Sequence, residues 1–553
     1  MVLAYIFISL VFNLTFRQAQ SPVEIDAQES QVIALVNGTN AFSYALKLEE
    51  IALNHSISEY SFRSAGSVGA SETAKWIEAQ FRSFGLEAYR ESFEFTNWSL
   101  LSKPELVIDY DGNQLAIGSF QSAHYSWPTS QNDFSDVVVL PLPEADNYND
   151  IGRYSINMAI WNAVNTTGKT LLIGKEIRWS TRWEQTFKDK LTTQPPAAVI
   201  YTWWYEWMNF TPPMFSSGGG RPLSSLGAYY WDLKIPVGWV NYEDGLLIRD
   251  RELELNVSAR VGINSVIGFG LHDNVIGRLP GSASPEKFII VSGHYDTVMT
   301  SGFCDNAAGT AGVIELARIL SEASRNGLYS PKCTVLFVAF ASEELALVGS
   351  VDYVRQHKSQ MEDIIAVVNL DCIGSDELAI TRTPEDELNL DELILEAASD
   401  LNVSAKLISP GGSDQEAFRN LEESNHVYTL WELDANISDA VPVKSSSMIS
   451  SSPIFYSDKW LREATGWIHT SYDNSTSTQT LDWVELDDLQ DHIRVAALSV
   501  MRVSPSAPST SFDQFTWLTP TTIIALTVIA AIVLLGVIVY FVKIRKPQSS
   551  QLD

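Results

Sequence analysis

Residues 287–294 read KFIIVSGH, a short apolar run that ends in a histidine. Two similar runs follow it, CTVLFVAFA (333–341) and IIAVVNLD (364–371). Between the first two, DNAAGTAGVIELARIL (305–320) has the spacing of an amphipathic helix. Apolar runs of this length are typical of parallel strands covered by helices on both faces of a sheet. The alternation therefore predicts an α/β fold with a mostly parallel, mixed sheet flanked by helices.

Further segments extend this domain in both directions. HVYTLWEL (426–433) predicts a fourth strand, and the apolar stripe over 486–501 predicts a closing helix. Much earlier, SETAKWIEAQFRSFGL (71–86) has helical spacing, for which Ser71 is the expected N-cap. Between these parts, residues 132–262 change to short apolar runs, Gly/Pro-rich turns and many tryptophans, which indicates a separate β-rich domain.

Residues able to bind a metal ion follow the carboxyl ends of the predicted strands. Ligands bind at this edge of an open α/β sheet, where loops after the strands converge. Taken singly, these residues have ordinary explanations, such as a helix cap for Asp305 or a surface position for His469. Together, unpaired carboxylates would repel one another, and zinc would relieve this because it accepts mixed histidine and carboxylate ligands. The residues are His294, Asp296, Asp305, Glu343, Glu344, Asp371 and His469.

The composition excludes several classes of protein. The chain has 553 residues, of which 45% are hydrophobic, enough to bury two or more domains and too many for a disordered chain. Its net charge of −30 argues against a nucleic-acid partner, since phosphate binding needs a positive surface. Three cysteines do not make a disulfide scaffold and leave open one bridge or three buried thiols. Cys304 and Cys372 each stand beside a candidate ligand, so a contact between them is one alternative.

Both ends of the chain indicate export to a membrane. An apolar run followed by small and polar residues indicates a signal peptide over 1–20, or an N-terminal anchor. A charge-free apolar stretch predicts a transmembrane helix over 520–542, after a Ser/Pro-rich stalk at 504–519. Lys543 and further basic residues follow the helix. Because positive residues stay on the cytoplasmic side, the tail (543–553) is expected in the cytoplasm and the folded domains outside.

Glycosylation sequons agree with this topology. N-x-[ST] triplets act as acceptors only in an exported chain, so they predict a glycoprotein if the chain crosses the membrane. They occur at Asn37, Asn54, Asn97, Asn165, Asn209, Asn256, Asn402, Asn436 and Asn474.

Five motifs stand in an order that resembles a known family: VSGHYDTV, SGFCDNAAGTAGVIELARIL, VLFVAFASEELALVGS, VVNLDCIG and HTSYD. Together they are similar to the core of the co-catalytic zinc aminopeptidases, which include aminopeptidase Y, bacterial leucyl aminopeptidase and glutamate carboxypeptidase. The resemblance runs nearly without gaps over 274–380 and more loosely to His469, and it also covers 60–95. It implies a zinc exopeptidase-like fold and two zinc ions.

The resemblance also implies a set of metal ligands. His294 and Asp371 would bind one zinc ion. Glu344 and His469 would bind the other, and Asp305 would bridge the two.

Two further residues would take part in the chemistry by the same resemblance. Glu343 would be the general base toward a water activated by the two zinc ions. Asp296 would accept the second N–H of the first histidine ligand and set its tautomer. The chain departs from the usual pattern at Cys304, Ala346 and Gln415, and none of these removes a metal ligand. The third departure puts the chemistry of the substrate pocket in doubt.

The middle of the chain resembles a protease-associated domain, which is found inserted in several of these peptidases. The motifs that carry this likeness are GKTLLIG (168–174), PPAAVIYT (195–202) and IPVGWVNYEDGLLI (235–248). We therefore expect an inserted domain over 126–264 within a zinc peptidase domain made of 30–125 and 265–503.

The function predicted from these features is a zinc-dependent exopeptidase that acts outside the cytoplasmic membrane on peptides or proteins and removes N-terminal residues. A glutaminyl cyclase is an alternative with one zinc, and a carboxypeptidase or a non-catalytic receptor-like relative would share the fold. Retention of His294 and Asp296 favours two metals, and the complete ligand set favours catalysis. The groups that recognise a free peptide end lie in variable loops, and the oligomeric state stays open.

Overall fold

The computed structural model describes most of the chain between residues 25 and 503. Several predictions fall outside the described residues: the signal segment, the strand at 426–433, His469, the stalk, the membrane helix and the tail. Among the described residues, no helix combines the length and apolar character needed to cross a bilayer. The described ranges are 25–56, 62–123, 126–129, 133–140, 162–174, 189–202, 233–298, 300–345, 347–375, 377–381, 390–408, 413–419, 445–450, 473–476 and 484–503.

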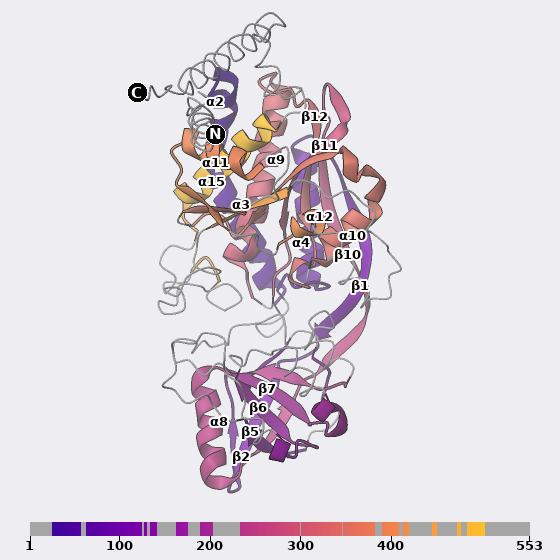
Figure 1. Ribbon diagram of the computed structural model, residues 1–553, viewed down its shortest axis with the longest axis vertical. Helices are drawn as coiled ribbons and strands as arrows, with labels where there is room; N and C mark the ends of the chain where they lie inside the picture. The colour runs from indigo at the N-terminus through magenta and orange to yellow at the C-terminus, as the bar shows by residue number, and fades with distance from the viewer. Residues whose placement is uncertain are drawn as a thin grey trace, which may run out of the picture. The chain divides into compact units, whose positions relative to one another are not determined.

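A mixed sheet forms the centre of the first part of the fold, in the order β1-β10-β12-β11-β13-β16-β14-β15 (Figure 1). Its middle strands β12, β11, β13 and β16 run parallel, whereas β10 is antiparallel to β12 and β14 to β16. The predicted α/β class with a mixed sheet is confirmed. The strands are β1 (Glu87–Leu100), β10 (Ser265–Leu279), β11 (Ser284–His294), β12 (Cys333–Phe340), β13 (Ile364–Asp371), β14 (Leu378–Thr381), β15 (Ala405–Ile408) and β16 (Ser445–Ser450).

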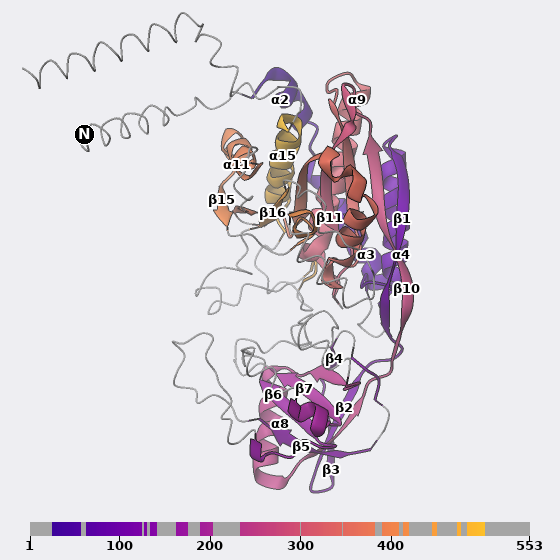
Figure 2. The ribbon, with the colours of Figure 1, turned by 45° about the vertical axis from the view of Figure 1, so that its right-hand side comes forward.

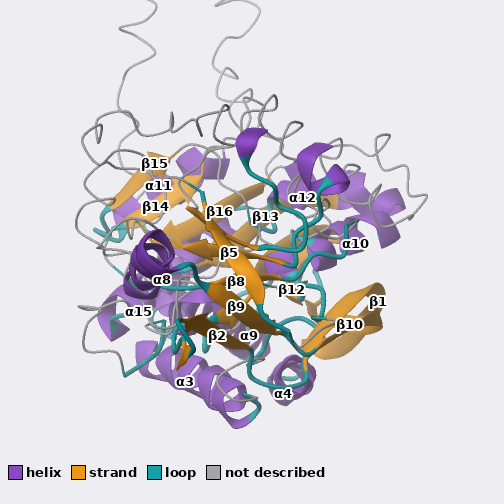
Figure 3. Cartoon of the chain, turned by 90° about the horizontal axis from the view of Figure 1, so that it is seen from below, coloured by secondary structure: helices purple, strands orange, loops and turns teal. Residues whose placement is uncertain are grey.

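Helices cover both faces of this sheet, as the apolar strand runs predicted. Successive strand residues point to opposite faces, so Ile289 and Val291 join one apolar cluster and Ile290 joins another. The larger cluster includes α3, α4, α9 and α15, and the smaller one includes α10 and α12 (Figure 3). The helices are α2 (Ala27–Ile33), α3 (Gly38–Asn54), α4 (Val68–Ser83), α9 (Gly309–Arg325), α10 (Val348–Gln356), α11 (Leu390–Asp400), α12 (Glu416–Arg419) and α15 (Leu486–Arg502).

Helix α4 begins earlier than its sequence pattern indicated. Its N-cap is Ser67, whose Oγ accepts a hydrogen bond from the backbone N–H of Ala70 at 3.0 Å. The prediction that Ser71 caps the helix is wrong, because Ser71 lies inside the first turn and its hydroxyl donates to the carbonyl of Ser67 at 3.2 Å. Both serines can cap a helix, so only the position of the preceding chain decides between them.

A second sheet is built from the chain between β1 and β10, which pair antiparallel along their whole length (Figure 2). Its strand order is β3-β2-β9-β5-β6-β7-β8-β4, with α8 (Tyr242–Leu255) beside it. It includes β2, β3 and β4, which lie before residue 126, where the inserted domain was expected to begin. Its likeness to a protease-associated domain stays a prediction. The strands are β2 (Glu105–Tyr110), β3 (Asn113–Ala116), β4 (Gln121–Ser122), β5 (Ser135–Val139), β6 (Thr170–Gly174), β7 (Ala198–Thr202), β8 (Val237–Trp239) and β9 (Ser258–Gly262).

Candidate metal centre

The parallel strands bring the first candidate ligands together. The last register pair of β11 with β13 is Ser292 with Asn369, and His294 and Asp371 each lie two residues further along. On the other side of β11, His294 pairs with Phe340, the last residue of β12. Because these strands point the same way, their carboxyl ends meet at one edge of the sheet. The strand register therefore explains why residues far apart in sequence share a site.

His294 is the centre of the resulting cluster. Its Nε2 lies 3.1 Å from Oδ1 of Asp305 and 3.3 Å from Oδ1 of Asp371. The same nitrogen lies 3.9 Å from Oε2 of Glu343. Two groups of possible metal-binding atoms result, each within 4.8 Å: His294 with Asp305 and Asp371, and His294 with Glu343 and Glu344. The structure thus brings together all the predicted metal ligands that it describes, while His469 lies outside the described residues.

Asp305 does not cap a helix, which was its ordinary explanation. It lies in a turn, Phe303–Ala308, and its own φ of −112° and ψ of 93° are not helical. Helix α9 starts only at Gly309, after an N-cap residue that has no side-chain capping bond. The prediction that Asp305 begins the helix is therefore wrong. Its side chain does not cap the helix that follows.

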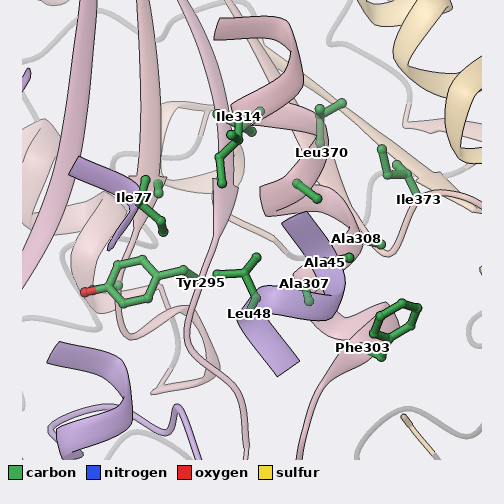
Figure 4. Packing of buried hydrophobic residues seen from close by; sticks show 14 of the residues in the cluster. Ala45, Leu48, Ile77, Tyr295, Phe303, Ala307, Ala308, Ile314, Leu370 and Ile373 are labelled. Atoms are coloured by element: carbon green, nitrogen blue, oxygen red, sulfur yellow. The ribbon is translucent and has the colours of Figure 1, made fainter. Parts of the chain in front are cut away.

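Asn306 fixes this turn against the end of β13. Its Nδ2 donates to the carbonyl of Leu370 at 2.9 Å. Its Oδ1 accepts from the backbone N–H of Cys372 at 3.1 Å and of Gly309 at 2.9 Å. The turn also packs on α3, where Ala45 and Leu48 lie beside Ala307 and Ala308 (Figure 4). The hydrogen bonds of Asn306 consequently hold the turn that carries Asp305 next to the end of the strand that carries Asp371.

Asp296 connects two of the strand ends. Its carboxylate accepts the backbone N–H groups of Glu343 at 3.0 Å and Glu344 at 3.3 Å. Its backbone carbonyl lies 3.1 Å from Nδ1 of His294, whereas its carboxylate Oδ1 lies 3.7 Å away. Since a carbonyl only accepts, Nδ1 carries the hydrogen in that contact, and Nε2 is the ring nitrogen that faces the carboxylates. The tautomer of His294 therefore suits a metal at Nε2.

Electrostatics favour a cation at this cluster. Burial raises the pKa of Glu343 well above its usual range; Glu344 and Asp371 add to this, and His294 opposes it. Burial lowers the pKa of His294, but the nearby carboxylates outweigh burial and raise that pKa well above its ordinary value. The buried acids thus hold a proton on the imidazole in the absence of another positive charge. A divalent cation would replace that proton, and the donors present, one imidazole and several carboxylates, fit zinc.

Asp414 is a residue of this site that the sequence reasoning missed. It is fully buried. Burial raises its pKa to about 7; the charge of His294 opposes this shift, and Asp296 and Asp371 contribute to it. The motif around residues 413–415 was the available signal, but it drew attention to Gln415, which is buried and accepts from Asn369 at 3.3 Å.

The three cysteines are free and buried. The thiols of Cys304 and Cys372 hydrogen-bond to each other, so the contact considered from the sequence exists. No metal-binding group among the described residues includes a cysteine.

Comparison with known proteins points to one family. Residues 274–497 match the model of peptidase family M28. A probable zinc metalloprotease of Pyrenophora teres f. teres is 29% identical over 156 residues, which are 27% of this chain and 32% of that protein. A glutamate carboxypeptidase 2 homolog of Caenorhabditis briggsae is 26% identical over 207 residues, 36% of this chain and 24% of that protein. The chain thus spans about a third or less of the length of these relatives.

Solved structures share the fold. A zinc aminopeptidase from Bacillus subtilis aligns with a TM-score of 0.59 at 20% identity, covering 86% of this chain and 97% of that one. An aminopeptidase from Aneurinibacillus sp. strain AM-1 aligns with a TM-score of 0.56 at 19% identity, covering 86% and 96%. At these identities the likeness establishes the mixed α/β fold of zinc aminopeptidases.

Proposed function

We propose that this chain, whose residues 274–497 match the model of peptidase family M28, is a zinc-dependent exopeptidase that removes N-terminal residues from peptides. The observation that carries the proposal is the convergence of His294, Asp305 and Asp371 with the glutamate pair Glu343 and Glu344 at the carboxyl ends of three parallel strands. Two zinc ions are part of the proposal, with His469 as the remaining ligand. When bound, they supply Lewis acidity that activates water and polarises the scissile carbonyl.

Glu343 is the proposed general base. Its Oε2 lies 3.9 Å from Nε2 of His294, farther than the nearest oxygens of Asp305 and Asp371, and its side chain keeps 13% of its surface exposed. A carboxylate so placed can accept a proton from the attacking water and pass it to the leaving amine. Asp296 holds its backbone N–H at 3.0 Å, so the base is oriented by the same residue that contacts the imidazole.

The charge around the site supports action at the amino end of a peptide. Two carboxyl groups of the site, those of Glu343 and Asp414, are not assigned to zinc and so keep their charge for the substrate, and Asp414 acts on the pKa of Glu343. The ammonium of a free N-terminus is attracted to such surroundings, whereas a free C-terminal carboxylate needs a cation to bind it. A carboxypeptidase is the second candidate, because one relative is a glutamate carboxypeptidase 2 homolog.

Metal analysis of the full-length chain tests the proposal. We expect about two zinc ions per chain, loss of peptide hydrolysis after dialysis against a chelator, and recovery when zinc is returned. One tightly bound zinc together with cyclisation of N-terminal glutamine would instead identify a glutaminyl cyclase. A chain that binds no zinc would refute the proposal.

Blocked peptides decide which end is cut. Each peptide of a mixed library is offered with either an acetylated N-terminus or an amidated C-terminus, and the products are read by mass spectrometry. We expect the amidated peptides to be shortened and the acetylated ones to survive, because acetylation removes the ammonium that the acidic site attracts. The reverse pattern would identify a carboxypeptidase.

We further propose that the peptidase is anchored in a membrane, with its folded part outside the cytoplasm. The apolar stretch at 520–542 and the basic residues after it support this orientation. Several expected glycosylation acceptors are accessible, since the exposed residues include Asn37, Asn54, Asn165, Asn256 and Asn402.

Truncation tests the anchor. Deleting residues 520–553 is expected to move the protein from the membrane fraction to the soluble fraction with unchanged kcat, because no predicted ligand lies in that segment. Activity per molecule and fractionation are measured side by side with the full-length chain. A truncated chain that still sediments with membranes would contradict the anchor, and a soluble but inactive one would show that the segment does more than tether.

A further inference from the structure

We propose that Asp473 and Arg63 are positioning residues that hold the backbone of segment 295–305 from both sides and so set where Asp305 presents its carboxylate. The inference rests on the proposed function, because it concerns the same metal centre. Neither residue belongs to the predicted catalytic set, and both come from parts of the chain distant from the segment they hold.

Arg63 binds the carbonyl groups of the segment. It is fully buried, and its guanidinium donates to the carbonyls of Tyr295 at 2.9 Å, Ser301 at 2.8 Å and Gly302 at 3.0 Å. These carbonyls lie at the beginning and near the end of the loop that leads from β11 to the Asp305 turn. The planar fork of arginine fixes the directions of its N–H groups, so one side chain holds the two ends of the loop relative to each other.

The charge of Arg63 serves the site as well. Among the described residues no carboxylate forms an ion pair with it. Burial lowers its pKa to about 10, and Asp473, Glu49, Asp296 and Asp305 oppose this shift. The side chain therefore stays positive at neutral pH and offsets part of the negative charge of the acidic cluster.

Asp473 binds the N–H groups of the same segment. Its carboxylate accepts from the backbone of Cys304 at 2.7 Å and of Asp305 itself at 3.2 Å. Its backbone carbonyl accepts from the N–H of Phe303 at 3.3 Å and from the hydroxyl of Ser301 at 2.6 Å. Four donors from one short stretch thus converge on a single residue, and the backbone of Asp305 cannot shift without breaking at least one of these bonds.

Glu49 anchors Asp473 to the rest of the fold. It lies on α3, is buried, and accepts from the backbone N–H of Ser475 at 2.9 Å and from the hydroxyl of the same serine. The turn on which Asp305 stands also contacts α3, where Phe42 and Phe303 meet edge to face with ring centroids 5.4 Å apart. Helix α3 is therefore the common base for Asp473 and for the turn that Asp473 holds.

Asp473 also connects two predicted ligands in the chain. It follows His469 by four residues in the motif HTSYD, and its carboxylate holds Asp305. A ligand that is shared by two metal ions would need to be placed within about 0.5 Å, and residues that orient ligands typically change metal affinity by about 10–100-fold when they are replaced. We therefore assign Asp473 the task of setting the position of Asp305 for metal binding.

Zinc titration of the metal-free, full-length chain tests this assignment. Asp473→Asn keeps the size of the side chain, but its amide NH2 opposes one of the two backbone N–H groups. We expect zinc affinity, measured by competition with a chromophoric chelator, to fall by about 10–100-fold. The visible spectrum of the cobalt-substituted protein should change in shape, because the ligand geometry changes. Arg63→Lys keeps the charge, loses the fork and should shift both readouts in the same direction.

Asp352→Asn is the matched control. Asp352 is also buried, at 2% exposure, but it hydrogen-bonds to Arg355 and Gln356 on α10 and holds no part of the metal loop. Its replacement should change zinc affinity by no more than about twofold and leave the cobalt spectrum as in the unmodified chain. Circular dichroism of the metal-free variants shows whether they are folded, and if Asp473→Asn is not, Arg63→Lys decides the question.

Two outcomes would overturn the inference, and they are distinguishable. If the unmodified chain binds zinc and a folded Asp473→Asn variant binds it with the same affinity and cobalt spectrum, Asp473 does not position Asp305 and the proposed function stands. If the unmodified chain binds no zinc, both the inference and the proposed function fail.

Discussion

Replacing Glu343 by glutamine is expected to lower kcat by about 10²–10⁴-fold, the usual contribution of a general base, while the zinc content stays the same. Glutamine keeps the shape of the side chain but cannot accept a proton. The predicted zinc ligands are other residues, and the substitution leaves them in place. Among them, Nε2 of His294 lies 3.1 Å from Asp305 and 3.3 Å from Asp371. Steady-state hydrolysis of amino-acyl reporter substrates and metal analysis of the same preparation provide the two measurements.

Glu315→Gln is the control for this prediction. Glu315 lies on α9 and is more deeply buried than Glu343, and it binds Arg318 at 2.6 Å and the backbone N–H of Asn37 at 2.9 Å. Its replacement should reduce stability and leave kcat unchanged. Normal turnover by the Glu343→Gln variant would show that another group is the base, and Asp414, whose buried carboxyl acts on the pKa of Glu343, would be the next to replace.

Asp305→Asn is expected to remove zinc and, with it, activity. The carboxylate lies 3.1 Å from Nε2 of His294. It does not cap helix α9, whose N-cap residue is Ala308. Loss of the metal contribution, worth several kcal/mol in the transition state, corresponds to at least about 10²–10⁴-fold in kcat/KM. Zinc per chain after gel filtration and kcat/KM are measured on one preparation.

Asp400→Asn controls for the loss of a buried aspartate. Asp400 pairs with Arg502 at 2.7 Å at the end of α11, so its replacement should weaken folding without lowering zinc content. An Asp305→Asn variant that retains two zinc ions and full activity would exclude Asp305 as a bridging ligand.

The central strands were predictable because their signal is local. KFIIVSGH, CTVLFVAFA and IIAVVNLD are apolar on both faces, and each face is covered by its own cluster, as Ile289 and Ile290 show. The start of α4 was not predictable from the same information. Ser67 and Ser71 both suit an N-cap, and the choice depends on a close approach: a side chain on Gly69 would come within 1.9 Å of the carbonyl of Phe62.

The candidate site divides in a similar way. His294, the glutamate pair and Asp371 follow strands, so the direction of the strands places them at one edge. Asp305 was singled out as a candidate ligand but placed at the start of a helix, because helical spacing continues through the residues after it. Its turn exists because Asn306 binds Leu370 and Cys372 across 64 and 66 residues of sequence. No local pattern encodes such contacts.

By itself, the sequence determined which residue types stand at the ends of the central strands. The continuous apolar runs that form these strands are a local property of the chain, and so are the residues that end them. Only the tertiary structure decided how Asp305 is held. Arg63 reaches Tyr295 across 232 residues of sequence, and Asp473 reaches Asp305 across 168. Both act on backbone groups, which every residue carries, so the segment they hold shows no sequence signature. Their role follows from where folding brings the chain segments together.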